Sequence, residues 1–321
     1  MIGSKAALTC STVGVLKFRL GEKAAVSPLE ELKKHKMRCE QRAPIGATEF
    51  AVGSPLPDNP GVVIPRVERS TFHEEFVREN HHISVVMISV EAARRFVEQG
   101  ETAASAFPDV FVAVTTTIHD ERLEWWYPDR EVGLVRDFQP DIYLPCDRPV
   151  YASDRPAERR DTIRRYLNDL ADVTDRLAEA PIAIIPLVKG VTESERHRCY
   201  QEFRTLGLDR WAYYCAQYFL YGNRGEDLVQ DVHSVVQEGS PRGLVLVGLQ
   251  SGSYLSRMPS EVFAAAGKRW IDQSNLRDDA LDMQQIQRNY GTWKRQIKNI
   301  LDGGQTHLGD YFSSGVIAYG D

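Results

Sequence analysis

Short apolar runs alternate with longer segments of helical periodicity from about residue 83 onward. The runs are rich in Val, Ile and Tyr and are apolar at nearly every position, which is typical of strands buried on both faces of a parallel sheet. We expect strands over residues 83–90, 109–118, 141–146, 181–188, 211–218, 243–249 and 269–271. Either residues 13–20 or residues 61–67 offer an eighth strand.

Helical periodicity fills the segments between these runs. Residues 156–180 carry apolar side chains at spacings of three and four, with charged residues on the opposite face. A capping-box pair predicts another helix that begins at Thr192. Two more helices are expected, over residues 260–267 and over residues 276–300, the second interrupted at Gly291.

Alternating strands and helices predict an α/β fold. Eight strands favour a closed TIM (β/α)8-like barrel over an open doubly wound sheet, and 321 residues suffice for such a barrel with an extension. We therefore expect an N-terminal extension over residues 1–80, packed on a catalytic barrel over residues 81–321. The glycine fingerprints of dinucleotide-binding and P-loop proteins are absent from the sequence.

Composition narrows the class of protein further. A net charge of −6 argues against a protein that coats nucleic acid non-specifically. A protein with this net charge can still carry a local basic face. The five cysteines are odd in number and lack C-x-x-C spacing, which indicates reduced thiols rather than disulfides or structural zinc. No metal and no cofactor is expected. Without a signal peptide or an apolar run of membrane length, the sequence predicts a cytoplasmic protein with no membrane contact.

Asp272 is the most informative candidate for chemistry. It follows the last expected strand and precedes the longest amphipathic helix. Carboxylates at the carboxyl ends of strands are where alternating β/α folds perform chemistry. The alternative from the local sequence is that Asp272 caps the following helix.

Aromatic and basic residues cluster after the strand expected at residues 109–118. They favour either a platform on which an extruded base stacks, or a loop folded over the sheet with its aromatic rings buried. The residues are Arg122, Trp125, Trp126, Tyr127 and Arg130.

Four local patterns carry a resemblance to a known family. They are residues 140–149 (PDIYLPCDRP), 187–190 (LVKG), 246–249 (LVGL) and 264–274 (AAAGKRWIDQS). Their order and spacing resemble the tRNA-guanine transglycosylase superfamily, including its branch that inserts 7-deazaguanines into DNA. The resemblance implies base exchange through a covalent aspartyl-nucleotide intermediate, with a carboxylate attacking C1′ before a 7-deazaguanine displaces it.

The resemblance also implies roles for individual residues. Asp272 matches the nucleophile, Asp147 matches the aspartate that recognises the base, and Lys189 and Gly190 match the pocket wall. A carboxylate is a competent nucleophile at an oxocarbenium-like carbon because it stabilises the developing positive charge. A second carboxylate accepts the paired N–H groups of a guanine-like base. Gly248 is expected in a loop at a strand end, where either the backbone approaches a ligand or the chain makes a plain turn.

The sequence departs from the family at the end of the strand expected over residues 109–118. An Asp-Ser-Gly-Gly-Phe-Gln motif is replaced there by residues 115–120 (TTTIHD). We expect Asp120 to handle the proton of the base, with His119 as the alternative and Trp126 near the substrate. The family's zinc-binding cysteine cluster is absent, and Lys189 replaces its glutamine.

The resemblance implies nucleic acid and a preQ0-like 7-deazaguanine base as partners. DNA is favoured over tRNA because the chain ends soon after the barrel, and a homodimer or a partner subunit is compatible with the sequence. Two alternatives stay open. The chain is a non-catalytic barrel subunit that supports an active transglycosylase, or it is an enzyme of free 7-deazapurine nucleosides.

Overall fold

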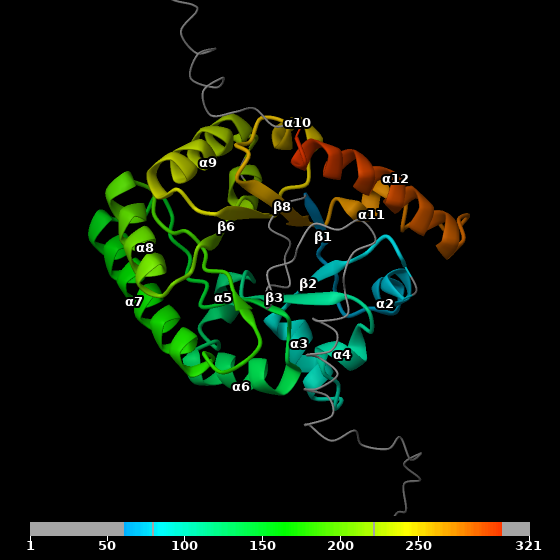
Figure 1. Ribbon diagram of the computed structural model, residues 1–321, viewed down its shortest axis with the longest axis horizontal. Coiled ribbons are helices and arrows are strands. Elements are labelled where there is room, and N and C mark those ends of the chain that lie inside the picture. The colour runs from blue at the N-terminus through cyan, green and yellow to red at the C-terminus, as the bar shows by residue number, and fades with distance from the viewer. Residues whose placement is uncertain (1–60, 79, 221, 304–321) are drawn as a thin grey trace, which may run out of the picture.

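The computed structural model describes residues 61–78, 80–220 and 222–303. Within these residues, parallel strands form two four-stranded sheets, ordered β1-β8-β7-β6 and β2-β3-β4-β5. Figure 1 shows the strands at the centre of the molecule with the helices around them. The α/β class is confirmed. The strand offered by residues 13–20 lies outside the described residues.

The strands are β1 (Val62–Pro65), β2 (Val85–Ser89), β3 (Phe111–Thr115), β4 (Ile142–Leu144), β5 (Ala183–Ile184), β6 (Arg210–Tyr214), β7 (Gly243–Val247) and β8 (Val262–Gly267). The helices are α2 (Thr71–Val77), α3 (Val90–Val97), α4 (Ala103–Ala106), α5 (Asp120–Leu123), α6 (Pro128–Phe138), α7 (Pro156–Arg176), α8 (Glu193–Thr205), α9 (Gly225–Gly239), α10 (Gly252–Leu255), α11 (Trp270–Gln273) and α12 (Met283–Leu301), with a 3-10 turn η1 at Ala216–Phe219. Across the described residues, no helix combines the length and the apolar character needed to cross a membrane.

Isolated bridges join the outer strands of the two sheets. Arg66, directly after β1, pairs with Met87 of β2, and Leu187, after β5, pairs with Ala212 of β6. Both bridges are parallel, and the Val67 N–H donates to the Met87 carbonyl at 2.9 Å. The carboxyl ends of all these strands therefore lie on the same side of the molecule.

β1 lies inside the segment expected as an N-terminal extension. It pairs with β8 in parallel register, and its four residues are buried. Of the two segments that offered an eighth strand, residues 61–67 therefore supply one. The sheets therefore include residues 62–65, which lie before the boundary expected at residue 80.

β8 corrects the helix expected over residues 260–267. The three alanines favour a helix locally, but Ala264 aligns with both Val62 of β1 and Val245 of β7. Ala264–Ala266 are fully buried. Hydrogen bonding and packing on both edges therefore override the helix propensity. The strand expected at residues 269–271 is also wrong, because Trp270 begins helix α11.

The other helices follow the sequence more closely. α7 and α8 are confirmed, and Thr192 caps α8 through a capping box. The strand expected to reach residue 218 ends at Tyr214, and η1 follows it. α12 begins later than expected and runs through Gly291 without interruption. A Cβ atom there would lie 2.5 Å from the His82 ring, so Gly291 permits a close contact.

A stacked aromatic pair packs α8 and α9 against β6. The rings of Tyr200 and Trp211 are parallel, with centroids 5.1 Å apart, and both side chains are buried. Gly239, the last residue of α9, leaves the space that the Trp211 ring fills.

Gly239→Ala is expected to lower the free energy of unfolding by about 1–3 kcal/mol, a typical cost of overpacking. The added Cβ atom would lie 2.3 Å from the Trp211 ring, which Tyr200 prevents from moving. Gly133→Ala in α6 is the matched control, because its Cβ atom would meet nothing within 4 Å. We expect that control to stabilise the protein by about 0.5–1 kcal/mol. Urea denaturation measures both, and equal effects would contradict the packing described here.

Burial of Lys294 on α12 generates a pH-dependent contribution to stability. Its ammonium donates to the His82 carbonyl at 2.7 Å. Burial lowers the pKa of Lys294 from 10.5 to about 8, and the Lys298 ammonium adds to the shift. Between these values the unfolded chain binds more protons than the folded protein, so the stability contributed by Lys294 rises with pH.

Replacement of Lys294 by methionine is expected to abolish that rise. The free energy of unfolding of the wild type should therefore rise relative to that of Lys294→Met as the pH increases from about 8 to 10.5. Urea denaturation at several pH values across this window measures the difference. Parallel pH profiles for the two proteins would show that Lys294 is not perturbed.

Candidate functional site

Polar side chains gather at the carboxyl ends of the strands. Each follows a different strand of the two sheets, so the parallel topology brings them to one side of the molecule. They are Arg66 after β1, Thr117 after β3, Asp147 after β4, Lys189 after β5 and Tyr214 at the end of β6. We call these five residues the strand-end cluster.

A buried ion pair lies at the centre of the strand-end cluster. The Lys189 ammonium pairs with the Asp147 carboxylate, and the two side chains are only 9% and 10% exposed. The Asp147 N–H donates to the Thr116 hydroxyl oxygen at 2.8 Å, and that hydroxyl donates to the Leu144 carbonyl at 3.0 Å. Two strands therefore position Asp147, which the sequence predicted as a base-recognising residue, against Lys189.

Arg66 adds a second, half-buried cation to the strand-end cluster. Its guanidinium donates to the Thr117 carbonyl at 2.5 Å and approaches the Thr117 hydroxyl at 3.3 Å. Burial lowers the pKa of Arg66, while Tyr214, Glu68 and Asp147 oppose the shift. Burial raises the pKa of Tyr214, and the Arg66 charge opposes that change. Tyr214 is therefore a neutral phenol between charged groups at neutral pH.

Asp120 approaches the strand-end cluster from the loop after β3. It accepts a hydrogen bond from the Tyr151 hydroxyl. Burial raises the pKa of Tyr151, and both Asp120 and Asp147 add to the shift. The same two carboxylates also act on Tyr214. The structure thus brings Asp120 and Asp147, two of the predicted site residues, near one pair of tyrosines.

The two residues expected beside Asp120 differ in exposure. His119 is exposed at the start of α5, where its side chain makes no capping bond. Trp126 is half-buried and packs against the hydrophobic core. Trp125 and Tyr127 are the exposed aromatic residues, and the Arg130 guanidinium lies 5.7 and 5.8 Å from their ring centroids. A stacking surface in this loop would therefore consist of these residues rather than Trp126.

Glu131 supports the turn that carries Asp147. Cys146 has a φ of 59°, an unfavourable value for a side chain other than glycine. The buried Glu131 carboxylate accepts the Cys146 N–H at 3.0 Å and the Tyr143 hydroxyl at 2.5 Å. Burial raises the pKa of Glu131, and these two hydrogen bonds oppose the shift. Glu131 therefore determines how the chain leaves β4.

Gly190 has a steric role after β5. Its φ is 118°, and an added Cβ atom would lie 2.8 Å from the Cβ atom of Glu195. Only glycine fits this sharp turn into α8. Glu195 then accepts the backbone N–H of Val191 and pairs with the buried Arg159 guanidinium at 3.0 Å.

Asp272 lies on α11, beyond the end of β8. Its side chain is 73% exposed and lies 4.0 Å from the Arg277 guanidinium. The interpretation that Asp272 caps the long helix is wrong, because Asp282 caps α12 by accepting the Gln285 N–H at 2.7 Å. In the described part of the chain, no hydrogen bond or ion pair joins Asp272 to Asp120 or Asp147.

Asp272 and Gly248 line one cavity of about 550 Å³ at the ends of β7 and β8. Gly248 has a φ of 94°, and an added Cβ atom would lie 2.9 Å from that of Ala216. We call this the β7–β8 cavity. Its lining residues are Phe219, Asn223, Gly248, Leu249, Gln250, Ser251, Tyr254, Lys268, Arg269, Ile271, Asp272 and Arg277.

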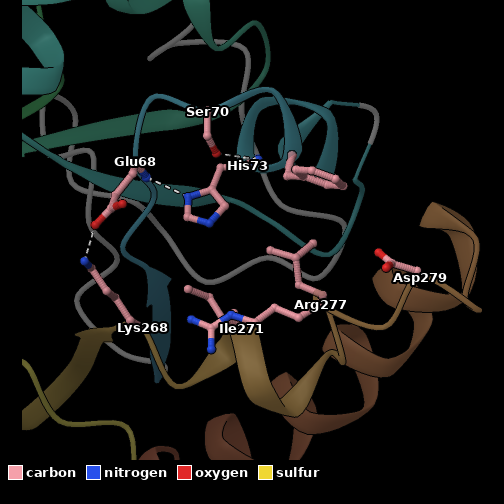
Figure 2. A pocket seen from close by; sticks show the side chains of 9 residues that line it. Glu68, Ser70, His73, Lys268, Ile271, Arg277 and Asp279 are labelled. Atoms are coloured by element: carbon pink, nitrogen blue, oxygen red, sulfur yellow. Dashed lines mark hydrogen bonds and ion pairs between the residues drawn. The ribbon is translucent and has the colours of Figure 1, made fainter.

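A second cavity, of about 420 Å³, lies between α2 and α11. Figure 2 shows His73, Lys268 and Arg277 around it, with Glu68 linked to both His73 and Lys268. The Glu68 N–H donates to His73 Nδ1 at 2.8 Å, so the proton of neutral His73 is on Nε2. Burial lowers the pKa of His73. Lys268, Ile271 and Arg277 line both cavities.

Sequence reasoning missed Arg66, Tyr151 and Tyr214 as members of the same region. Arg66 carried a signal, because it directly follows a run that offered a strand. Tyr151 carried none, since its contact with Asp120 joins loops that are 31 residues apart. Among the described residues, no group of three or more His, Cys, Asp or Glu side chains has the arrangement of a metal site.

The chain was also compared with protein-family models and with curated protein sequences, and neither comparison finds a match. Function is therefore inferred from the residues of the site themselves.

Lys189→Met is expected to lower the free energy of unfolding by about 3–5 kcal/mol, because Asp147 then stays buried without its cation. The double variant Asp147→Asn/Lys189→Met should recover part of that loss. Arg94→Ala is the control, since its pair with Glu98 is 3.6 Å long and mostly exposed, and we expect at most about 1 kcal/mol. Urea denaturation of the wild type, Asp147→Asn, Lys189→Met and the double variant completes the cycle, and Arg94→Ala is measured beside it. Additive effects of the two single substitutions would show that the pair is not coupled.

Proposed function

We propose that the eight strands close into a (β/α)8 barrel and that the protein is an enzyme acting at their carboxyl ends. The bridges from Arg66 to Met87 and from Leu187 to Ala212 support closure, because they join the outer strands of both sheets. Active sites of such barrels lie at the carboxyl ends of the strands. The strand-end cluster and the β7–β8 cavity are both on that side.

The reaction we propose is exchange of a guanine for a 7-deazaguanine in nucleic acid, with DNA favoured over tRNA. One observation carries the proposal: the Asp272 carboxylate is exposed on the wall of a cavity large enough for a nucleoside. A nucleophile must be accessible to C1′ of its substrate, and Asp272 meets that requirement. The target base must leave its stack to reach the cavity.

The remaining residues have roles in two steps. In the first, Asp272 forms a bond to C1′ while the bond from C1′ to N9 breaks, and the departing guanine takes a proton from water. In the second, N9 of the 7-deazaguanine displaces Asp272 and its proton passes to Asp120. Asp147 accepts the N–H groups of the base. Lys189, which pairs with Asp147, orients that carboxylate beside Gly190.

The ion pair between Lys189 and Asp147 favours a second candidate function, that of a non-catalytic barrel. Lys189 neutralises Asp147, and the carboxylate of Asp272 lies 4.0 Å from the Arg277 guanidinium. A barrel of this kind binds a nucleoside or a partner subunit without performing chemistry. The protein would then support an active transglycosylase.

The described cysteines support a cytoplasmic location, which is part of this proposal. Cys146, Cys199 and Cys215 are free and buried. Burial raises the pKa of Cys199 to about 12, so this thiol stays protonated and unreactive.

Asp272→Asn is expected to abolish exchange while the protein stays folded, because the amide cannot form the covalent intermediate. The assay incubates purified protein with labelled 7-deazaguanine and guanine-containing DNA or tRNA, and measures label in the polymer. Asp161→Asn on α7 is the control, since that carboxylate is also on the surface and should leave exchange unchanged. A variant Asp272→Asn with normal turnover would exclude the nucleophile.

The same assay distinguishes the alternatives. Label transfer by the wild-type protein alone supports the transglycosylase. Transfer that requires an added transglycosylase subunit supports the non-catalytic barrel. Turnover of free nucleosides without transfer to either polymer supports the nucleoside enzyme.

A further inference from the structure

The β7–β8 cavity lies where (β/α)8 barrels frequently bind phosphate. Its lining includes Gly248–Ser251, from the loop after β7, and Lys268–Arg269, from the loop after β8. Loops after the seventh and eighth strands recur as phosphate-binding elements in this fold class. Position alone does not identify a ligand, so the chemical class of the ligand is inferred from the charged and aromatic residues that line the cavity.

Cationic side chains outnumber carboxylates in this cavity. Asp272 is its acidic residue, whereas Lys268, Arg269 and Arg277 are basic. The Lys268 ammonium already pairs with Glu68, which lines the other cavity. Arg277 is 80% exposed and lies 4.0 Å from Asp272.

Arg269 has spare hydrogen-bonding capacity. It is exposed, and no carboxylate in the described parts of the chain lies within ion-pair distance of it. Guanidinium groups form paired hydrogen bonds with phosphate oxygens. Arg269 and Arg277 together can therefore bind a group with two negative charges.

Two aromatic residues form an aromatic part of the cavity wall. The Phe219 and Tyr254 rings are 5.7 Å apart and inclined at 49°, and Phe219 is 36% exposed. The Tyr254 hydroxyl donates to the Asn223 side-chain oxygen at 2.8 Å. Gly225 leaves room for the Tyr254 ring, since a Cβ atom there would lie 2.2 Å from it. The wall is thus held in place before a ligand arrives.

Gln250 contributes an acceptor without a partner. The side chain is 3% exposed, and its Nε2 group donates to the Ile64 carbonyl at 3.0 Å. Among the described residues, its Oε1 atom has no hydrogen-bond donor. Its Nε2 group also approaches the Ala265 carbonyl at 3.4 Å, so Gln250 is held against the backbone of β1 and β8 as a fixed part of the cavity wall.

We propose that the β7–β8 cavity binds a nucleoside phosphate. The phosphoryl group contacts Arg269 and Arg277, and the base lies against Phe219. The phosphoryl group belongs either to a free nucleotide or to a nucleotide of single-stranded nucleic acid. This inference names the substrate class of the proposed function and rests on it for the role of Asp272, whereas binding requires no turnover.

Calorimetric titration of the full chain tests the proposal with guanosine 5′-monophosphate, guanosine and inorganic phosphate as probes. We expect the monophosphate to bind more tightly than guanosine or phosphate. Arg269→Ala and Arg277→Ala should each weaken the monophosphate about tenfold, the scale of a charge-assisted hydrogen bond, and leave guanosine unchanged. Phe219→Ala should weaken guanosine and the monophosphate but not phosphate.

Arg94→Ala on α3 is the matched control, because it also removes an arginine that pairs loosely with a carboxylate. It should bind all probes like the wild type. Equal affinity for guanosine and its monophosphate, no binding of either, or equal losses in Arg94→Ala and Arg269→Ala would overturn the proposal.

Two further measurements show whether the ligand is a free nucleotide or part of a nucleic acid, and which of the two proposals fails if one does. The phosphoryl group belongs to nucleic acid if a single-stranded oligonucleotide binds more tightly than the monophosphate and loses that advantage in Arg269→Ala. It belongs to a free nucleotide if the monophosphate binds more tightly than the oligonucleotide. Binding of the monophosphate without any base exchange contradicts the proposed function alone. Base exchange with unaltered binding in Arg269→Ala contradicts this inference alone.

Discussion

Parallel backbone pairing of β8 with both β1 and β7 is the constraint on which the rest of the structure depends. Ala264 pairs on both edges, so β8 joins the start of the described chain to its last third. This pairing places the ends of β1, β7 and β8 side by side. Figure 1 shows β1 and β8 near the centre, between α12 and the helices that follow β2. Both cavities are built on that arrangement.

The parallel pairing of the strands creates two electrostatic environments on the same side of the molecule, one in the strand-end cluster and one in the β7–β8 cavity. Around Asp147 and Lys189, charges are buried, paired and held by backbone hydrogen bonds. Around Arg269, Asp272 and Arg277, charges are exposed and loosely paired. Buried pairs lose much of their stabilisation to desolvation but keep a fixed geometry, whereas exposed charges are free to meet a ligand. The first environment suits orientation, and the second suits binding.

Local patterns predicted most strands and the longer helices, because burial on both faces and capping leave clear marks in a sequence. The same patterns failed at residues 260–271, where a run of alanines indicated a helix. Small side chains also fit a strand with neighbours on both edges, and only the partners decide between the two. The error placed Asp272 at a strand end, whereas the structure has it on helix α11, and it hid that Asp282 caps α12.

The sequence by itself determined the α/β class, the order of its elements and the presence of carboxylates after the strands at β3, β4 and β8. Those properties depend on residues close together along the chain. Tertiary structure alone decided that Asp147 meets Lys189, that Tyr151 donates to Asp120, and that Asp272 lines the β7–β8 cavity. Each of these depends on which strand ends become neighbours, and backbone pairing between distant segments sets that.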